Sequence, residues 1–200
     1  MTAPAAYTLK RNPLTARVYR RAWDRKHAAL PQRFVFVATT GRSGTEFLQR
    51  VFSSVAGCVA VHEAWPIMNG PVMQAWNEGE EWGARRTYWV QKAVNIRRMS
   101  GDHDLYVETN HVFVKCFAQY AIEDFGDRLS IIHLRRDPVS VARSMLELGG
   151  IPGTEHGNDW YLDYRAPRNL VSIEDQLADG APLFDDFFRC LWYWYEIEAR

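Results

Sequence analysis

The chain has 200 residues and a mass of 23.2 kDa, which predicts one compact domain, or one domain with an arm, and excludes a multi-domain assembly. Its 47% hydrophobic residues exclude a disordered chain, because disordered chains lack the apolar surface that offsets the entropy of folding. The 24 basic and 24 acidic residues cancel, yet residues 1–33 carry eight Lys or Arg and one Asp, a net charge of +7. We therefore expect a basic arm or helix over residues 1–32, hydrated or bound to an acidic partner, and an α/β domain over residues 33–200.

The cysteine pattern and the hydropathy bear on the compartment. The three cysteines, Cys58, Cys116 and Cys190, are an odd number and lie far apart, which argues against a disulfide framework or a zinc ribbon and for a reducing compartment. No stretch approaches the ~18 consecutive apolar residues of a transmembrane helix. Basic residues, rather than an apolar segment, follow the first seven residues, so these do not read as a secretory signal. We expect a cytoplasmic protein.

Short apolar, β-branched runs alternate with segments of helical spacing through the middle of the chain. The runs predict strands over residues 33–39, 58–61, 104–109 and 129–134. Helical spacing predicts helices that begin at Thr45, Val112 and Pro138, and another over residues 88–99. Residues 149–182 predict a long irregular loop, and residues 183–200 an aromatic-rich helix without a stop signal. This alternation is typical of an α/β fold with a central, mostly parallel sheet flanked by helices.

The first predicted strand runs into a glycine-containing turn, Thr40–Thr45, and then into a helix. Glycines let successive backbone N–H groups point into one concavity, and the helix N-terminus adds unsatisfied donors. Arg42 adds a guanidinium and Thr45 a hydroxyl, so the turn predicts a seat for a phosphate or sulfate group. A nucleoside-triphosphate P-loop requires Gly-x-x-x-x-Gly-Lys-Ser/Thr, whereas this chain has Thr39 at the first glycine and Thr45 at the lysine. That difference disfavours a P-loop kinase or nucleotidase.

A second charged motif follows the strand predicted over residues 129–134. Arg136 leaves the end of this strand, and Ser144 lies eight residues later, about two turns into the next helix. An arginine and a hydroxyl so placed suit a second phosphate. Taken alone, the motif is equally typical of a helix start, with Asp137 at the cap and Pro138 in the first turn.

Together, the two motifs resemble those of the sulfotransferases that use 3′-phosphoadenosine 5′-phosphosulfate (PAPS) as sulfuryl donor. The resemblance covers about residues 33–146 and implies a P-loop-like sulfotransferase architecture. It implies metal-independent, in-line transfer from PAPS to a hydroxyl or amine of a small-molecule or glycan acceptor. The first motif would hold the 5′-phosphosulfate and the second the 3′-phosphate, which gives as cofactor-binding residues Thr40, Gly41, Arg42, Ser43, Gly44, Thr45, Glu46, Phe47, Arg136 and Ser144.

The chain departs from the family pattern in two places. Glu46 and Phe47 stand where many members carry a threonine and a tryptophan. Because an acid repels a sulfate, we expect Glu46 to face away from the seat or to bind something else. Members also carry a glycine-rich, basic segment near the C-terminus, which this sequence lacks, so we expect the natural chain to continue past Arg200.

Sulfuryl transfer requires a base for the acceptor and positive charge at the leaving group. Arg42 suits the second task. Glu63 is the first choice as base because it follows the second strand, and a glutamate serves there in several members of the family that the chain resembles. His62 and His111 are alternatives, since imidazole titrates near neutral pH. Three further residues are candidates for lining the pocket: Glu108, Asn110 and Lys115. Of these, Lys115 could neutralise the charge of the leaving group.

Aromatic residues of the irregular regions are candidates for an acceptor pocket: Trp65, Trp76, Trp82, Trp89, Trp160, Tyr161 and Tyr164. Those of the last helix, Trp192–Tyr195, are expected to pack in the interior.

Apart from the P-loop enzyme, the rival interpretation is a non-catalytic module that binds acidic partners through its basic arm. The zero net charge argues against nucleic acid as a partner. The acceptor and the oligomeric state stay open.

Overall fold

The computed structural model describes residues 12–27, 32–173 and 185–200. The expectations for residues 1–11, for the last part of the long loop and for the first two residues of the last helix fall outside these ranges. Within them, no helix combines the length and the apolar character that crossing a bilayer requires. All three cysteines are described, and none is bonded to another.

The centre of the molecule is a four-stranded sheet in which every pairing is parallel. The strands lie in the order β2-β3-β1-β4, and the four sequence-predicted strands match them to within one residue at each end. In register, Ala38 pairs with His133 and His62 pairs with Thr109, so the strands end at nearly the same level. Their bounds are β1 (Arg33–Ala38), β2 (Cys58–His62), β3 (Leu105–Thr109) and β4 (Leu129–His133).

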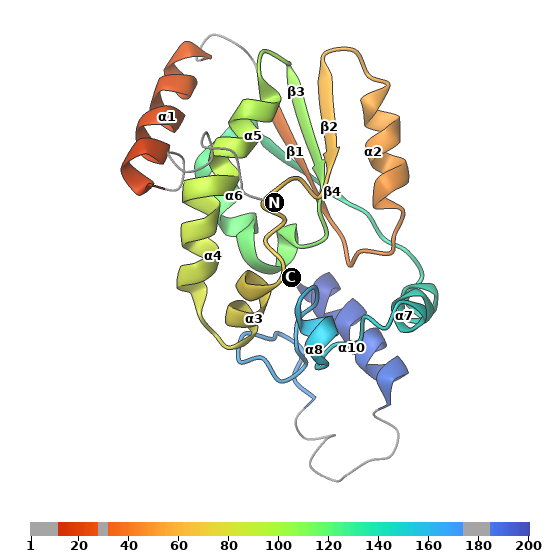
Figure 1. The fold of residues 1–200 in the computed structure, drawn as a ribbon. Coiled ribbons are helices and arrows are strands. Elements are labelled where there is room, and N and C mark those ends of the chain that lie inside the picture. The colour runs from red at the N-terminus through yellow and green to blue at the C-terminus, as the bar shows by residue number, and fades with distance from the viewer. Residues whose placement is uncertain (1–11, 28–31, 174–184) are drawn as a thin grey trace, which may run out of the picture.

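Helices flank the sheet on both faces (Figure 1). Helix α2 (Thr45–Ser53) packs over β2 and β3, whereas α6 (Ala118–Phe125) packs near β4 on the opposite face. Side chains alternate along β1, so Phe34 and Phe36 share one face, where they stack on Phe125 and Phe113. The mostly parallel α/β sheet that the sequence predicts is therefore confirmed.

The region between β2 and β3 is helical. Pro71 begins α3 (Pro71–Asn77), and α4 (Glu81–Thr87) continues through a π-helical turn, η3 (Tyr88–Lys92), into α5 (Ala93–Ser100). The helix predicted over residues 88–99 is confirmed. A second π-helical turn, η4 (Phe113–Phe117), leads into α6, and the short 3-10 helix η5 (Gly126–Arg128) precedes β4.

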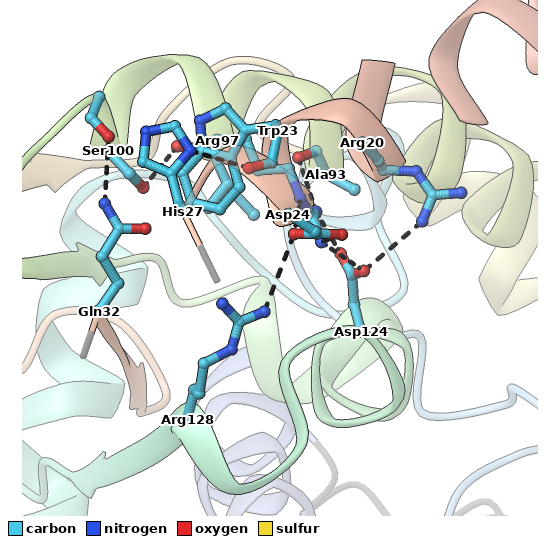
Figure 2. A network of polar contacts seen from close by, with 12 residues as sticks. Arg20, Trp23, Asp24, His27, Gln32, Ala93, Arg97, Ser100, Asp124 and Arg128 are labelled. Atoms are coloured by element: carbon cyan, nitrogen blue, oxygen red, sulfur yellow. Dashed lines mark hydrogen bonds and ion pairs between the residues drawn. The ribbon is translucent and has the colours of Figure 1, made fainter. Parts of the chain in front are cut away.

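Helix α1 (Pro13–Lys26) is joined to α5 and α6 by a cluster of ion-paired side chains (Figure 2). Arg97 of α5 is fully buried and donates to both carboxylate oxygens of Asp24 on α1 and of Asp124 on α6, at 2.7–3.2 Å. Arg20 also pairs with Asp124, at 3.5 Å. We call Arg20, Asp24, Arg97 and Asp124 the Arg97 cluster. Four other basic side chains of α1 are exposed, as the expected hydration predicts: Arg17, Arg21, Arg25 and Lys26.

Helix α10 (Asp186–Ala199) packs on α7 (Pro138–Glu147) beyond the carboxyl ends of the strands. The Tyr193 hydroxyl donates to the Thr40 carbonyl at 2.9 Å, and Trp194 Nε1 donates to the Arg136 carbonyl at 3.0 Å. The expected packing of Trp192, Tyr193 and Trp194 is confirmed. The same expectation is wrong for Tyr195, whose side chain is 56% exposed.

Candidate active site

Four charged or imidazole side chains form a row along the carboxyl edge of the sheet, each just after a different strand. Because the strand order is β2-β3-β1-β4, the row runs Glu63, His111, Arg42, Arg136. Neighbours in this row touch: His111 Nε2 lies 3.4 Å from Glu63 Oε1, and Arg136 Nη1 donates to the Arg42 carbonyl at 2.8 Å. The His111 ring packs against Gly41, where an added Cβ would lie 3.1 Å from its Cγ. The sequence predicts that these residues share an edge, and the topology sets their order.

The turn between β1 and α2 adopts backbone conformations that favour glycine. Gly41, Arg42 and Gly44 have φ angles of +81°, +55° and +92°. The hydroxyls of Thr40 and Ser43 both donate to the Gly41 carbonyl, at 2.8 and 2.9 Å, and so hold the turn in place. The sequence predicts that Thr40 and Ser43 bind the cofactor. In the structure, their hydroxyls instead make hydrogen bonds within the turn.

The N-terminus of α2 opens toward a cavity. Its cap residue is Gly44, which offers no side chain to bond the free N–H groups of the first turn. Such a terminus, with its positive dipole end, favours an anion. Thr45 is buried and lines the same cavity.

The two sequence motifs meet at Arg42. Its Nε donates to Ser144 Oγ at 3.0 Å, while its carbonyl accepts from Arg136. Arg42 and Arg136 both line the cavity, and Ser144 lies behind Arg42. The Ser144 hydroxyl accepts from Arg42 and keeps its own hydrogen to donate. Arg136 and Ser144 are therefore linked through Arg42 and do not touch each other directly.

The cavity has a volume of about 600 Å³. Glu46 is among its lining residues and is exposed. Phe47, one residue further along α2, is 72% exposed and does not line the cavity, which corrects its assignment as a cofactor-binding residue. The lining residues are Gly41, Arg42, Gly44, Thr45, Glu46, His62, Glu63, His111, Arg136, Leu148, Gly150, His156, Trp160 and Tyr161.

Glu63 stands at the opposite end of the row from Arg136. Its φ of +47° is rare for a residue with a side chain, and such strained backbone clusters at functional sites. His62 Nδ1 bonds the Thr109 carbonyl at 2.8 Å, and its Nε2 lies 3.8 Å from Glu63 Oε1. His111 Nε2 approaches the same oxygen, so both histidines face the Glu63 carboxylate.

His111 is a buried imidazole between Glu63 and Lys115. Lys115 Nζ lies 2.8 Å from His111 Nδ1 and donates to the Trp160 carbonyl at 2.5 Å. Burial, together with the nearby Lys115, holds the pKa of His111 well below its usual range. Burial likewise holds the pKa of Lys115 well below that of a free lysine. Lys115 is buried and is not among the residues that line the cavity.

Two other pocket candidates are structural. Glu108 and Asn110 are fully buried beneath the site and do not line the cavity. Glu108 is ion-paired with the buried Lys92 and accepts from Tyr106 at 2.8 Å and from Asn110 at 2.9 Å. Lys92 also donates to the Ala64 carbonyl at 2.6 Å, so this buried pair supports the segment that follows Glu63.

The aromatic candidates separate into two groups. Trp160 and Tyr161 line the cavity, whereas the other five do not. Three further lining residues, Leu148, Gly150 and His156, went unnoticed in the sequence. The segment between α7 and the short helix α8 (Glu155–Asn158) contributes Gly150, and its Gly-Gly and Pro-Gly pairs were the available signal.

The chain matches no protein-family model, no curated protein sequence and no solved structure. Among the residues that the structure describes, no group of three or more His, Cys, Asp or Glu side chains is arranged to hold a metal ion. What the site does must therefore be argued from its own residues.

Proposed function

We propose that this chain is a PAPS-dependent sulfotransferase with a P-loop-like sulfotransferase architecture. One observation carries the proposal: Arg42 and Arg136, from two separate strand-end loops, line a single cavity with a carboxylate, Glu63, among its other lining residues. A donor with phosphates on both sides of its ribose requires two such cationic points, and the acceptor requires a base. The position of the cavity supports the proposal, because the loops after β1 and β3 lead to helices on opposite faces, where α/β sheets commonly bind ligands.

The turn at residues 41–45 is proposed to hold the 5′-phosphosulfate. Its open backbone N–H groups and the Arg42 guanidinium provide hydrogen bonds to sulfate and phosphate oxygens. Arg136 is proposed to bind the 3′-phosphate; its guanidinium bonds the Arg42 carbonyl, and the Arg42 guanidinium in turn bonds the Ser144 hydroxyl. Thr40 and Ser43 fix the turn in which Arg42 sits.

In the proposed reaction the acceptor oxygen or nitrogen attacks sulfur in line with the bond to the phosphate oxygen. A new bond to sulfur forms, the bond between sulfur and the bridging oxygen breaks, and the electron pair stays on the departing nucleotide. Arg42 and the N-terminus of α2 stabilise that negative charge. Glu63 takes the proton from the acceptor, so no metal ion takes part in the step.

Glu63 is a better base than His111 because both nitrogens of His111 already face neighbours, Lys115 on one side and Glu63 on the other. Both histidines approach the Glu63 carboxylate, which lines the cavity and in this proposal faces the acceptor. Trp160 and Tyr161 supply apolar surface on which the acceptor packs.

Calorimetric titration of the full chain tests the nucleotide site. We expect 3′-phosphoadenosine 5′-phosphate (PAP) to bind equally well with and without magnesium, and more tightly than 5′-AMP. Magnesium-dependent binding of ATP without binding of PAP would favour a P-loop kinase instead. Steeply salt-dependent binding of RNA or DNA, lost when the basic arm is deleted, would favour a binding module. If PAP and ATP both fail to bind, the nucleotide site itself is refuted.

A further inference from the structure

Lys115 is a buried cation that the proposed reaction does not use. It is 1% exposed and belongs to η4, four residues after His111. Its Nζ is hydrogen-bonded to the Trp160 carbonyl and His111 Nδ1, and it lies 5.0 and 5.2 Å from the ring centroids of Tyr161 and Tyr193. A buried lysine is costly unless its hydrogens are bonded, so these two hydrogen bonds require an explanation.

The hydrogen bonds of Lys115 assign a tautomer to His111. Lys115 Nζ carries at least two hydrogens in either protonation state, enough to donate to both the Trp160 carbonyl and His111 Nδ1. With Lys115 as the donor, His111 Nδ1 presents its lone pair. The hydrogen of a neutral imidazole then sits on Nε2. Nε2 faces Glu63 Oε1 at 3.4 Å, which is long for a hydrogen bond but within the range of catalytic contacts that tighten when a ligand binds.

The groups around His111 disfavour a second proton on the ring. Lys115 faces it from η4, and Arg42 and His62 act on it from the ends of β1 and β2. Glu63 is the acidic neighbour, and Tyr161 packs at a ring-centroid distance of 5.7 Å. Two cations against one carboxylate, in a buried position, keep the ring neutral.

We infer that Lys115 is a positioning residue that locks His111 in the Nε2–H tautomer, so that the imidazole donates to Glu63 Oε1 and holds the carboxylate in place for the acceptor. The inference rests on the proposed function only for the role of Glu63 as base. Because Lys115 also bonds the Trp160 carbonyl, it ties the aromatic wall of the cavity to the same histidine. His111 is thereby a donor rather than a base.

Nitrogen-15 NMR of the full chain with labelled histidines tests the tautomer without any substrate. The His111 signal is assigned by its loss in His111→Gln. We expect the Nε2–H form, without protonation, between about pH 5 and 8. An Nδ1–H form, or a midpoint near the ordinary value of about 6.5, would overturn the inference. Because this measurement uses the unaltered protein, it does not depend on how well a variant folds.

The variant Lys115→Met, which keeps the length and apolar stem, gives the second test. We expect the His111 signal to become pH-dependent in this range, while the signals of His133 and His103, whose hydrogen bonds go to other residues, stay the same as in the unaltered protein. An unchanged His111 signal in a folded variant would refute the role of Lys115.

Measuring turnover of Lys115→Met distinguishes failure of this inference from failure of the proposed function. With PAPS as donor, Lys115→Met should lower kcat by up to about 10²-fold, leave PAP affinity unchanged and add a dependence on pH below 7. Normal turnover with an unchanged pH profile would refute the positioning role while leaving the sulfotransferase intact. If the tautomer is as expected but the unaltered chain neither binds PAP nor turns over PAPS, the proposed function fails, and with it the role assigned to Glu63.

Discussion

The Arg97 cluster and the row at the carboxyl edge of the sheet are both rich in charge, but they use their hydrogen-bonding groups to different extents. Arg97 is fully buried, and its guanidinium donates to two carboxylates and to the Ala93 carbonyl (Figure 2). The Arg136 side chain is exposed and makes one hydrogen bond among the described residues, from Nη1 to the Arg42 carbonyl. Arg136 also lines the cavity.

This difference separates a structural role from a binding role. A charge whose donors are all bonded inside the protein has nothing left for a ligand, and removing it leaves its partners buried without compensation. A charge with free donors beside a cavity contributes little to stability and is available to an anion. The four predictions below test this contrast.

The largest effect is expected for Glu63→Gln. Loss of the base should lower turnover of PAPS by about 10²–10⁴-fold. PAP affinity and the free energy of unfolding should change little, because Glu63 makes only long contacts with the two histidines. Formation of PAP from PAPS with a panel of alcohols and amines measures the turnover. The matched control is Glu78→Gln, an exposed acid at the end of α3, and comparable turnover of the two variants would remove Glu63 from the mechanism.

Arg97→Met should destabilise the fold by about 3–5 kcal/mol, because Asp124 would remain buried without its main partner. Urea unfolding of the variant and the unaltered chain measures the loss. Arg98→Met is the control: the neighbouring arginine is exposed, and its replacement should cost less than about 0.5 kcal/mol. Similar losses for the two variants would show that the Arg97 cluster has no special structural role.

Arg136→Ala should weaken PAP binding by about 10–100-fold, the range expected for charge-assisted hydrogen bonds. Binding of 5′-AMP, which lacks the 3′-phosphate, should change much less. Calorimetry with both nucleotides measures the difference. Arg143→Ala removes the same charge from an exposed position on α7 and serves as control. Equal weakening for PAP and 5′-AMP would contradict the assigned 3′-phosphate contact.

The smallest effect concerns the turn itself. Gly41→Ala should cost more than the roughly 1–2 kcal/mol of an alanine at positive φ, because its Cβ would also press on the His111 ring at 3.1 Å. Gly149 has a φ of +67° and open space where a Cβ would be added. The variant Gly149→Ala therefore measures the cost of an alanine at positive φ alone. Urea unfolding compares the two, and an equal cost would mean that the His111 ring yields freely.

The strands could be predicted from the sequence because each is a short, β-branched run with a turn at its end. The convergence of Arg42, Glu63 and Arg136 at one edge followed from parallel topology. The order of the strands could not be predicted, and so neither could the contact between His111 and Gly41. That contact depends on β3 inserting between β1 and β2.

The burial of individual side chains also could not be predicted from the sequence. Arg97 and Arg98 are adjacent in the same helix and have no local signal that distinguishes them, because the burial of Arg97 depends on Asp24, 73 residues away. Glu108 and Asn110 looked like site residues because they follow a strand, yet Lys92 pairs with Glu108 beneath the cavity. Pro71, by contrast, is a helix-start signal in the sequence, and it begins α3, a helix that was not predicted.

Helix α10 has a consequence for how the molecule is made. Tyr193 bonds a carbonyl 153 residues earlier in the chain, and Trp194 bonds one 58 residues earlier. Contacts of such long sequence separation close late in folding. During translation, the loops carrying Arg42 and Arg136 therefore acquire the support of α10 only after that helix has left the ribosome, long after the sheet that bears them has been synthesised.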